Sequence, residues 1–191
     1  SRILAFDTWQ ERWGNTDRVL TEEQNESVAM QTFSGLDLTK RIVEGQAGID
    51  GMTAAKRCWN YQKGGFQWYL PCLMELGVLC AYRDEINKAM KEIGCPDECL
   101  LPTEDSDETW VWSSSESSQN DSWYVNFSGG YFDNYIKYGS YVVRAVAAFQ
   151  PSPSLLTGEA KSNDCLHSDE ALINMLRERG YKGELTKTLT I

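Results

Sequence analysis

The sequence predicts an α+β fold, in which a group of helices comes first and a run of strands follows. Apolar residues recur at helical spacing in several segments between residues 37 and 94, and at every second position after residue 110. Residues 110–149 hold 11 of the 22 aromatic residues of the 191-residue chain. Aromatic side chains are common in strands, so we expect a small, mostly antiparallel sheet that is flanked by the helices.

The first half of the chain is expected to contain two short strands and four helices. Asp37 or Thr39 caps the first helix, Gly64 and Gly65 end the second, and Gly94 ends the last. In chain order, the predicted elements are a strand at 2–9, helices at 37–46 and 52–62, a strand at 66–71, and helices at 72–82 and 83–94.

Three of these helices should each turn a defined set of apolar side chains toward the core. Ile42 and Val43 form the inner face of the helix at 37–46. The two later helices place a longer set inward, namely Leu73, Leu76, Leu79 and Cys80 in the first and Ile86, Met90 and Ile93 in the second.

The second half of the chain is expected to form the remaining strands. In residues 122–128, SWYVNFS, the apolar Trp123, Val125 and Phe127 alternate with polar neighbours, which predicts a strand with one buried face. Residues 141–149, YVVRAVAAF, are more continuously apolar and predict a central strand.

Two regions follow from this reading of the chain. Residues 1–150 form the main domain, and the PSPS segment at 151–154 is a linker, since its two prolines restrict the backbone. Residues 155–191 are expected to add a helix and a final strand, so 151–191 is a short α/β extension.

The composition argues against several classes of partner. The formal net charge is −10 and no basic cluster is present, so we expect no nucleic-acid binding. No apolar run approaches the roughly 20 residues that a transmembrane helix needs, so we expect no membrane insertion. The six cysteines are expected to be mostly buried thiols rather than structural disulfides.

Candidate catalytic and metal-binding residues are few, and we expect no enzyme, cofactor or metal site. His167 is the only histidine, and no nucleophile with a suitable context is near it in sequence. The serines at 113–115 lack a nucleophile elbow and are expected to cap a strand end or a loop. Cys95 and Cys99 lack a second pair of zinc ligands.

A restricted set of residue types fills residues 113–141. Of these 29 residues, 19 are Ser, Tyr, Gly or Asn. Antibody combining sites favour the same set, because tyrosine offers a large contact area at low entropic cost while the small polar residues adapt their hydrogen bonds. The composition indicates a binding surface; a tyrosine-rich sheet face that binds nothing is the alternative.

Four segments carry a resemblance to a known family: WYLPCLMELGVL at 68–79, VWSSSES at 111–117, SWYVNFSGG at 122–130 and YVVRAVAAF at 141–149. The chain resembles C-type-lectin-like domains related to the formylglycine-generating enzyme, and most closely the variable proteins of diversity-generating retroelements of bacteria and phages. The resemblance spans roughly residues 35–149, and the 42 residues after Phe149 depart from it.

The resemblance implies which positions vary. In that family, mutagenesis of adenines in AAC codons rewrites exposed positions between fixed scaffold residues. The fixed positions would be Trp123, Val125, Phe127, Gly130, Phe132, Lys137, Ser140 and Arg144. The ligand-binding positions would be Asp121, Tyr124, Asn126, Ser128, Gly129, Tyr131, Asp133, Asn134, Tyr135, Ile136, Gly139, Tyr141 and Val142, with Asn126 and Asn134 unaltered.

The function expected from these observations is non-enzymatic binding to a protein or glycan on a cell surface. The resemblance implies a phage tail protein in a virion or a bacterial surface protein, with a homo-oligomer such as a trimer, or a virion protein, as its assembly partner. The first alternative is a calcium-dependent lectin that uses Glu116, Asp121, Asp133 and Asn134. The second is an enzyme of the formylglycine-generating class, which would need reactive cysteines, and residues 100–164 contain none.

Overall fold

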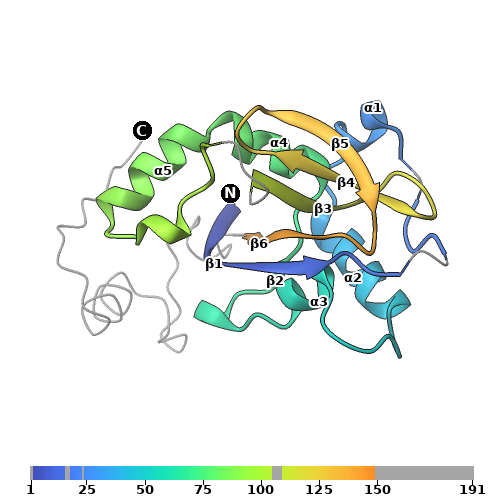
Figure 1. Cartoon of the computed structure of the whole chain (residues 1–191). Helices are drawn as coiled ribbons and strands as arrows, with labels where there is room; N and C mark the ends of the chain where they lie inside the picture. The colour runs from blue at the N-terminus through green and yellow to red at the C-terminus, as the bar shows by residue number, and fades with distance from the viewer. Residues whose placement is uncertain (1, 16–17, 23, 105–108, 149–191) are drawn as a thin grey trace, which may run out of the picture. The chain divides into compact units, whose positions relative to one another are not determined.

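A six-stranded sheet forms the centre of the protein in the computed structural model (Figure 1). The structure describes residues 2–15, 18–22, 24–104 and 109–148. The strand order is β1-β6-β3-β4-β5, and β2 pairs with β6 beside this path. The strands are β1 (Arg2–Arg12), β2 (Trp68–Tyr69), β3 (Trp110–Glu116), β4 (Asp121–Asn126), β5 (Tyr131–Ile136) and β6 (Ser140–Ala148).

Most strand pairs are antiparallel, which confirms the expected sheet type. The exception is the parallel pair of β3 and β6, in which Val111 lies opposite Val142. Strand β6 lies between β1 and β3, so the prediction that residues 141–149 form a central strand is confirmed for the described part. Its continuous apolar run reflects burial on both faces of the sheet.

The helices pack on both faces of the sheet, as two hydrophobic clusters show. Val111, Val125 and Val142 share one cluster with residues of α1 and α4, whereas Trp112, Tyr124 and Val143 share the other with residues of α2 and α3. Successive strand residues point to opposite faces, so the clusters lie on opposite sides of the sheet. The helices are α1 (Glu26–Ala29), α2 (Gly35–Gly45), α3 (Ala54–Trp59), α4 (Leu73–Ala81) and α5 (Arg83–Glu92).

The mixed architecture of helices and sheet confirms the α+β part of the predicted fold class, and most elements lie where the sequence placed them. Leu73 and Leu76 of α4 are fully buried, as their spacing predicted. Some details were wrong. Ser34, not Asp37 or Thr39, is the N-cap of α2, because the helix already begins at Gly35. The Thr39 hydroxyl is buried within the helix and lies within hydrogen-bond distance of the carbonyl oxygens of Gly35 and Leu70.

Three other element predictions need correction. The strand expected at 66–71 is reduced to the two residues of β2, because only these pair with β6. Helix α3 ends at Trp59, and the 3-10 turn η1 (Lys63–Gly65) follows it. Ile93 is exposed rather than inward, because α5 ends at Glu92.

The predicted linker, helix and strand at 151–191 lie outside the described residues, as do Cys165 and His167. The elements named above belong to one compact unit, residues 1–149. Among the described residues, no helix has the length and apolar character needed to cross a lipid bilayer.

Candidate functional site

The register of β4 and β5 decides how the predicted binding positions are divided between the two faces of the sheet. Asp133 lies opposite Tyr124, and Tyr135 lies opposite Ser122, so these side chains share a face with Tyr131. Phe132, Asn134 and Ile136 point to the other face. The sequence-based expectation of one surface is therefore wrong for Asn134 and Ile136, because side chains alternate along β5.

Five aromatic rings gather on the Tyr124 side of the sheet, and Tyr124 is at their centre. Its ring stacks on Trp110, with ring centroids 4.2 Å apart, and the Tyr141 ring lies 5.0 Å away. The Trp112 and Tyr135 rings lie 5.4 and 6.1 Å from Tyr124. Tyr135 and Tyr141 also contact each other edge to face at 5.3 Å. We call these five residues the aromatic layer.

The aromatic layer buries Tyr124, whose residue is only 6% exposed. Asn126 and Val142 are also buried. The expectation that these three predicted binding residues are exposed is wrong, because helices or other aromatic rings cover both faces of β4, and because Val142 belongs to the central strand β6. Burial, and then the nearby Tyr141, raise the pKa of Tyr124 to about 12. Tyr124 therefore supports the surface from below.

The exposed part of the surface lies on β5 and the turn that follows it. Tyr131 is 67% exposed and Tyr135 is 44% exposed. Tyr138, which the sequence reasoning did not include among the binding residues, is 55% exposed in the turn between β5 and β6. Its place beside Gly139 within the tyrosine-rich segment is the sequence feature that could have identified it as a binding residue. We call Tyr131, Tyr135 and Tyr138 the exposed tyrosines.

Two predicted variable glycines make room for these rings. A side chain on Gly129 would meet the Tyr131 ring, since a Cβ atom there would lie 2.1 Å from Tyr131 Cε2. A Cβ atom on Gly139 would lie 2.8 Å from Tyr141 Cε2 and 2.9 Å from Tyr135 Cδ1. The residue types at 129 and 139 therefore decide where the neighbouring tyrosine rings can lie.

The turn between β4 and β5 is held by Asn126. Its Oδ1 accepts hydrogen bonds from the Ser128 hydroxyl at 2.7 Å and from the Gly129 N–H at 2.8 Å. The turn closes with the N–H of Gly130 donating to the Asn126 carbonyl oxygen. Gly130 has a φ of +71°, a left-handed conformation that favours glycine.

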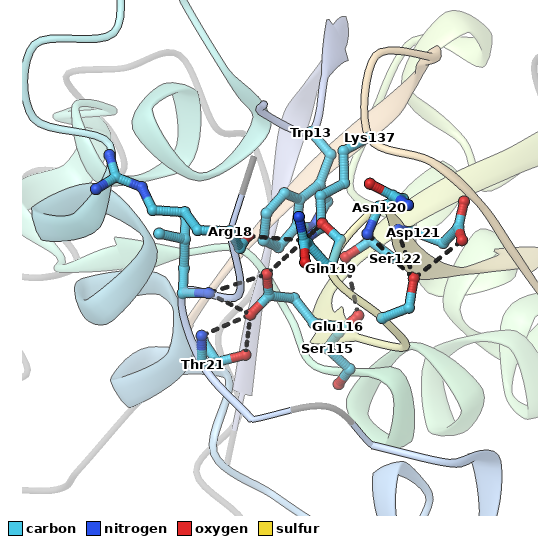
Figure 2. A network of polar contacts seen from close by, with 12 residues as sticks. Trp13, Arg18, Thr21, Ser115, Glu116, Gln119, Asn120, Asp121, Ser122 and Lys137 are labelled. Atoms are coloured by element: carbon cyan, nitrogen blue, oxygen red, sulfur yellow. Dashed lines mark hydrogen bonds and ion pairs between the residues drawn. The ribbon is translucent and has the colours of Figure 1, made fainter. Parts of the chain in front are cut away.

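A buried ion pair fixes the other end of β5 (Figure 2). Lys137 Nζ lies 2.6 Å from Glu116 Oε1, and neither side chain is exposed. The same ammonium donates to the carbonyl oxygen of Gln119 at 2.8 Å and lies 4.9 Å from the centre of the Trp13 ring. Glu116 also accepts from the backbone N–H groups of Leu20 and Thr21. The Lys137 side chain therefore holds the fold together and is not available at the surface.

The turn between β3 and β4 joins this network and places Asp121. The Ser118 hydroxyl donates to Asp121 Oδ2 at 3.0 Å, and the Lys137 N–H donates to the Asn120 carbonyl oxygen at 2.9 Å (Figure 2). Asp121 is therefore half-buried at the start of β4, opposite Ile136 at the end of β5.

The serines at 113–115, which were expected to cap a strand end or a loop, lie within β3 near its end. The Ser113 hydroxyl donates to the Trp123 carbonyl oxygen at 2.8 Å, and the Ser115 hydroxyl accepts from the N–H of Leu73 at 3.1 Å. All three residues are completely buried. The hydroxyls of Ser113 and Ser115 satisfy backbone groups where the β3–β4 register shifts and where α4 begins.

The four residues proposed as calcium ligands do not meet in one place. Glu116 is buried against Lys137, and Asp133 and Asn134 point to opposite faces of β5. Over the described ranges, no group of three or more His, Cys, Asp or Glu side chains is arranged to hold a metal ion. The arrangement does not support the lectin alternative in the form that the sequence indicated.

The described cysteines are present as thiols, and several have perturbed acidity. Cys58, Cys72 and Cys95 are buried, whereas Cys80 and Cys99 are half-buried. Burial raises the pKa of Cys72 to about 11, and it raises the pKa of Cys58 further. These two thiols are therefore poor nucleophiles at neutral pH.

Comparison with known proteins shows a similarity in fold to one solved structure. The chain is similar to a fimbrial protein from Bacteroides ovatus ATCC 8483, known from a crystal structure, with a TM-score of 0.54 and 15% sequence identity. The match covers 78% of this chain but 35% of the fimbrial protein, so the chain spans about a third of that protein's length. No family model and no curated protein matches the sequence.

Proposed function

We propose that this protein binds a partner on a cell surface without catalysing a reaction, and that the exposed tyrosines are the centre of its binding face. The observation that carries the proposal is the exposure of Tyr131, Tyr135 and Tyr138, together with the packing of the Tyr135 ring against Tyr124 and Tyr141 of the aromatic layer. Exposed tyrosines that are held by packed neighbours lose little entropy on binding.

The shape of this region favours a macromolecular partner. The exposed tyrosines project from the edge strand β5 and from a turn, where a protein or an oligosaccharide can approach a broad surface. Aromatic residues dominate the binding energy of protein interfaces. Asp133, Ser128 and Gly129 offer polar contacts, so these three residues of the set predicted from the sequence form the rim of the proposed face.

The proposal places the protein on a bacterial surface or in a phage particle. The similar fold of a fimbrial protein supports a surface role, and the sequence motifs support the C-type-lectin-like and variable-protein assignment. In this proposal the exposed positions of β5 and its flanking turns are those rewritten by diversification. Lys137, Phe127 and Gly130 remain constant because the fold needs them.

The binding face can be tested with a triple variant, Tyr131→Ala/Tyr135→Ala/Tyr138→Ala. Binding of the purified full chain to intact bacterial cells is compared with that of a matched variant, Phe33→Ala/Phe66→Ala/Tyr82→Ala, which removes three exposed aromatic residues elsewhere. We expect the first variant to lose binding at least tenfold and the second to keep it, with both melting temperatures near wild type. Equal binding by both would contradict the assignment.

Diversification is tested separately, by sequencing the DNA around the gene. A reverse-transcriptase gene together with a near-copy of the segment encoding residues 113–142, differing at adenines, is the expected result. If the neighbourhood contains neither, the surface is a fixed binding face and the variable-protein assignment is wrong.

A further inference from the structure

A cavity of about 560 Å³ lies beside β1, and its lining residues are separate from those of the exposed tyrosines. Its walls come from β1, from the region of α3 and from the 3-10 turn η2 (Asp97–Cys99). The lining residues used below are Asp7, Trp9, Arg57, Asn60, Tyr61 and Glu98. None of these residues was predicted to be functional from the sequence.

An irregularity in β1 forms one wall of the cavity. Leu4 pairs with Val146 and Thr8 pairs with Arg144, so three residues of β1 face the single residue Ala145 of β6. Bulges of this kind redirect side chains and are common beside binding sites. Two of the three residues in this bulge, Phe6 and Asp7, line the cavity as a result.

The aromatic wall is held in place by specific contacts. The Tyr61 ring lies edge to face against Trp9 at 5.0 Å and against Trp68 at 5.1 Å, and its hydroxyl donates to Asp7 Oδ2. The Arg57 guanidinium lies 5.9 Å from the centre of the Trp9 ring and donates to Glu11. A preorganised wall of this kind reduces the entropy cost of binding.

One carboxylate oxygen remains available on that wall. Tyr61 and Lys63 both donate to Oδ2 of Asp7, while no hydrogen bond from the described residues reaches its Oδ1. The hydrogen bond from Tyr61 lowers the pKa of Asp7, so the group is a charged acceptor at neutral pH. Asn60 and Arg57 add donors to the same cavity.

The charges around the cavity cancel. Asp7, Glu11 and Glu98 are negative, and Arg57, Lys63 and Arg144 are positive. The cations disfavour a cationic ligand, and the carboxylates disfavour an anionic one. A neutral ligand that both donates and accepts hydrogen bonds, and has an apolar face for Trp9 or Tyr61, fits these walls best.

We infer that this cavity binds the ring of a neutral saccharide, as a site additional to the proposed tyrosine face. Asp7 Oδ1 accepts a hydroxyl hydrogen bond, Asn60 and Arg57 donate to ring or hydroxyl oxygens, and the C–H face of the pyranose packs on the aromatic wall. A single small ring in a shallow site binds with a dissociation constant on the order of 1 mM.

The probes are the methyl glycosides of glucose, galactose, mannose and N-acetylglucosamine. Binding to the full chain is followed by saturation-transfer NMR and by quenching of tryptophan fluorescence. The variants are Asp7→Asn, which keeps the size of the side chain, and Glu98→Gln at an exposed position. Tyr135→Ala on the tyrosine face is the matched control, and the melting temperature of each variant is measured.

We expect at least one glycoside to bind wild type and Tyr135→Ala equally. Asp7→Asn should weaken glycoside binding tenfold or more. Glu98→Gln should weaken it about threefold, with an unchanged melting temperature. Failure of all four glycosides to bind would overturn the inference. Binding lost only in Tyr135→Ala would place the sugar on the tyrosine face, and would thus support the proposed function while rejecting this site. If tetramethylammonium or acetate bound better than the glycosides and competed with them, the assignment of a neutral ligand to this cavity would be wrong.

Discussion

Lys137 Nζ and Glu116 Oε1 lie 2.6 Å apart, and both side chains are completely buried. Removing one partner of such a pair leaves an uncompensated charge away from water. The pair also links the end of β5 to the N-terminal segment around Leu20 and Thr21, because Glu116 accepts hydrogen bonds from both backbone N–H groups. The position of the β5–β6 turn, which carries Tyr138, therefore depends on this buried contact.

Lys137→Met is expected to lower the free energy of unfolding by about 3–5 kcal/mol, since the Glu116 carboxylate would stay buried without its cation. Urea unfolding measures the change. The double variant Lys137→Met/Glu116→Leu should lose less than the single variant. As a control, Lys91→Met removes an exposed ion pair with Asp97 and should change the unfolding free energy by less than about 1 kcal/mol. A loss as small as that of the control would contradict the structural role of Lys137.

Tyr124→Ala is expected to destabilise the protein by about 3–5 kcal/mol, because it removes the central ring of the aromatic layer. Tyr131→Ala, at an exposed position of β5, should cost less than about 1 kcal/mol. Chemical unfolding of the two variants decides between a supporting and a binding role for Tyr124. Equal effects of both substitutions would mean that Tyr124 is not part of the core.

Titration with alkali should show that Tyr124 ionises at a higher pH than an ordinary tyrosine. The folded state favours the neutral form of Tyr124, so its pKa rises from about 10 to about 12. The stability that this shift contributes is fully present below pH 10 and is lost as the pH rises through 12. The tyrosinate absorbance of wild type minus Tyr124→Phe is expected to rise near pH 12. A difference spectrum that rises near pH 10 would show that the ring is open to water.

Gly139→Ala should move the rings of Tyr135 and Tyr141, because a Cβ atom at position 139 occupies their place. The substitution is expected to weaken cell binding while the melting temperature changes little, since the neighbouring rings can rotate away. In a double-mutant cycle with Tyr135→Ala, the coupling in binding free energy should be about 0.5–3 kcal/mol. Ser140→Ala, beside it and exposed, is the control. If the effects of Gly139→Ala and Tyr135→Ala on the binding free energy were strictly additive, Gly139 would not act through Tyr135.

Thiol labelling at pH 8, read by peptide mass spectrometry, should follow burial. Cys99 and Cys80 are half-buried and should react first, whereas Cys72, with a pKa of about 11, should react slowly, and Cys58 should react last. Unfolding in urea should make the rates similar. Fast labelling of Cys58 in the folded protein would contradict its place in the core.

Local patterns in the sequence predicted much of the fold, because some elements are encoded by spacing alone. The face of Leu73 and Leu76 identified α4, and the apolar run of residues 141–149 identified the central strand. The alternation of Trp123, Val125 and Phe127 correctly assigned these side chains to one buried face. In each case the periodicity of a single element was sufficient.

The local sequence patterns did not predict which of the proposed binding positions are exposed. Tyr124 and Tyr131 both occupy alternating positions and both suit a paratope-like surface, yet one is buried and the other exposed. The difference depends on Trp110 and Tyr141, which belong to neighbouring strands. The local pattern of a strand shows which side chains share a face, but not what covers that face.

By itself, the sequence determined the α+β class, the two sets of side chains on β4, and a tyrosine-rich segment that is suited to binding. Only the tertiary structure decided that Tyr124 packs beneath Tyr135, that Lys137 pairs with Glu116 across 21 residues, and that residues of a bulge in β1 line a cavity. Periodicity is a property of neighbouring residues, whereas burial, ion pairing and cavity formation depend on segments that meet only when the chain folds.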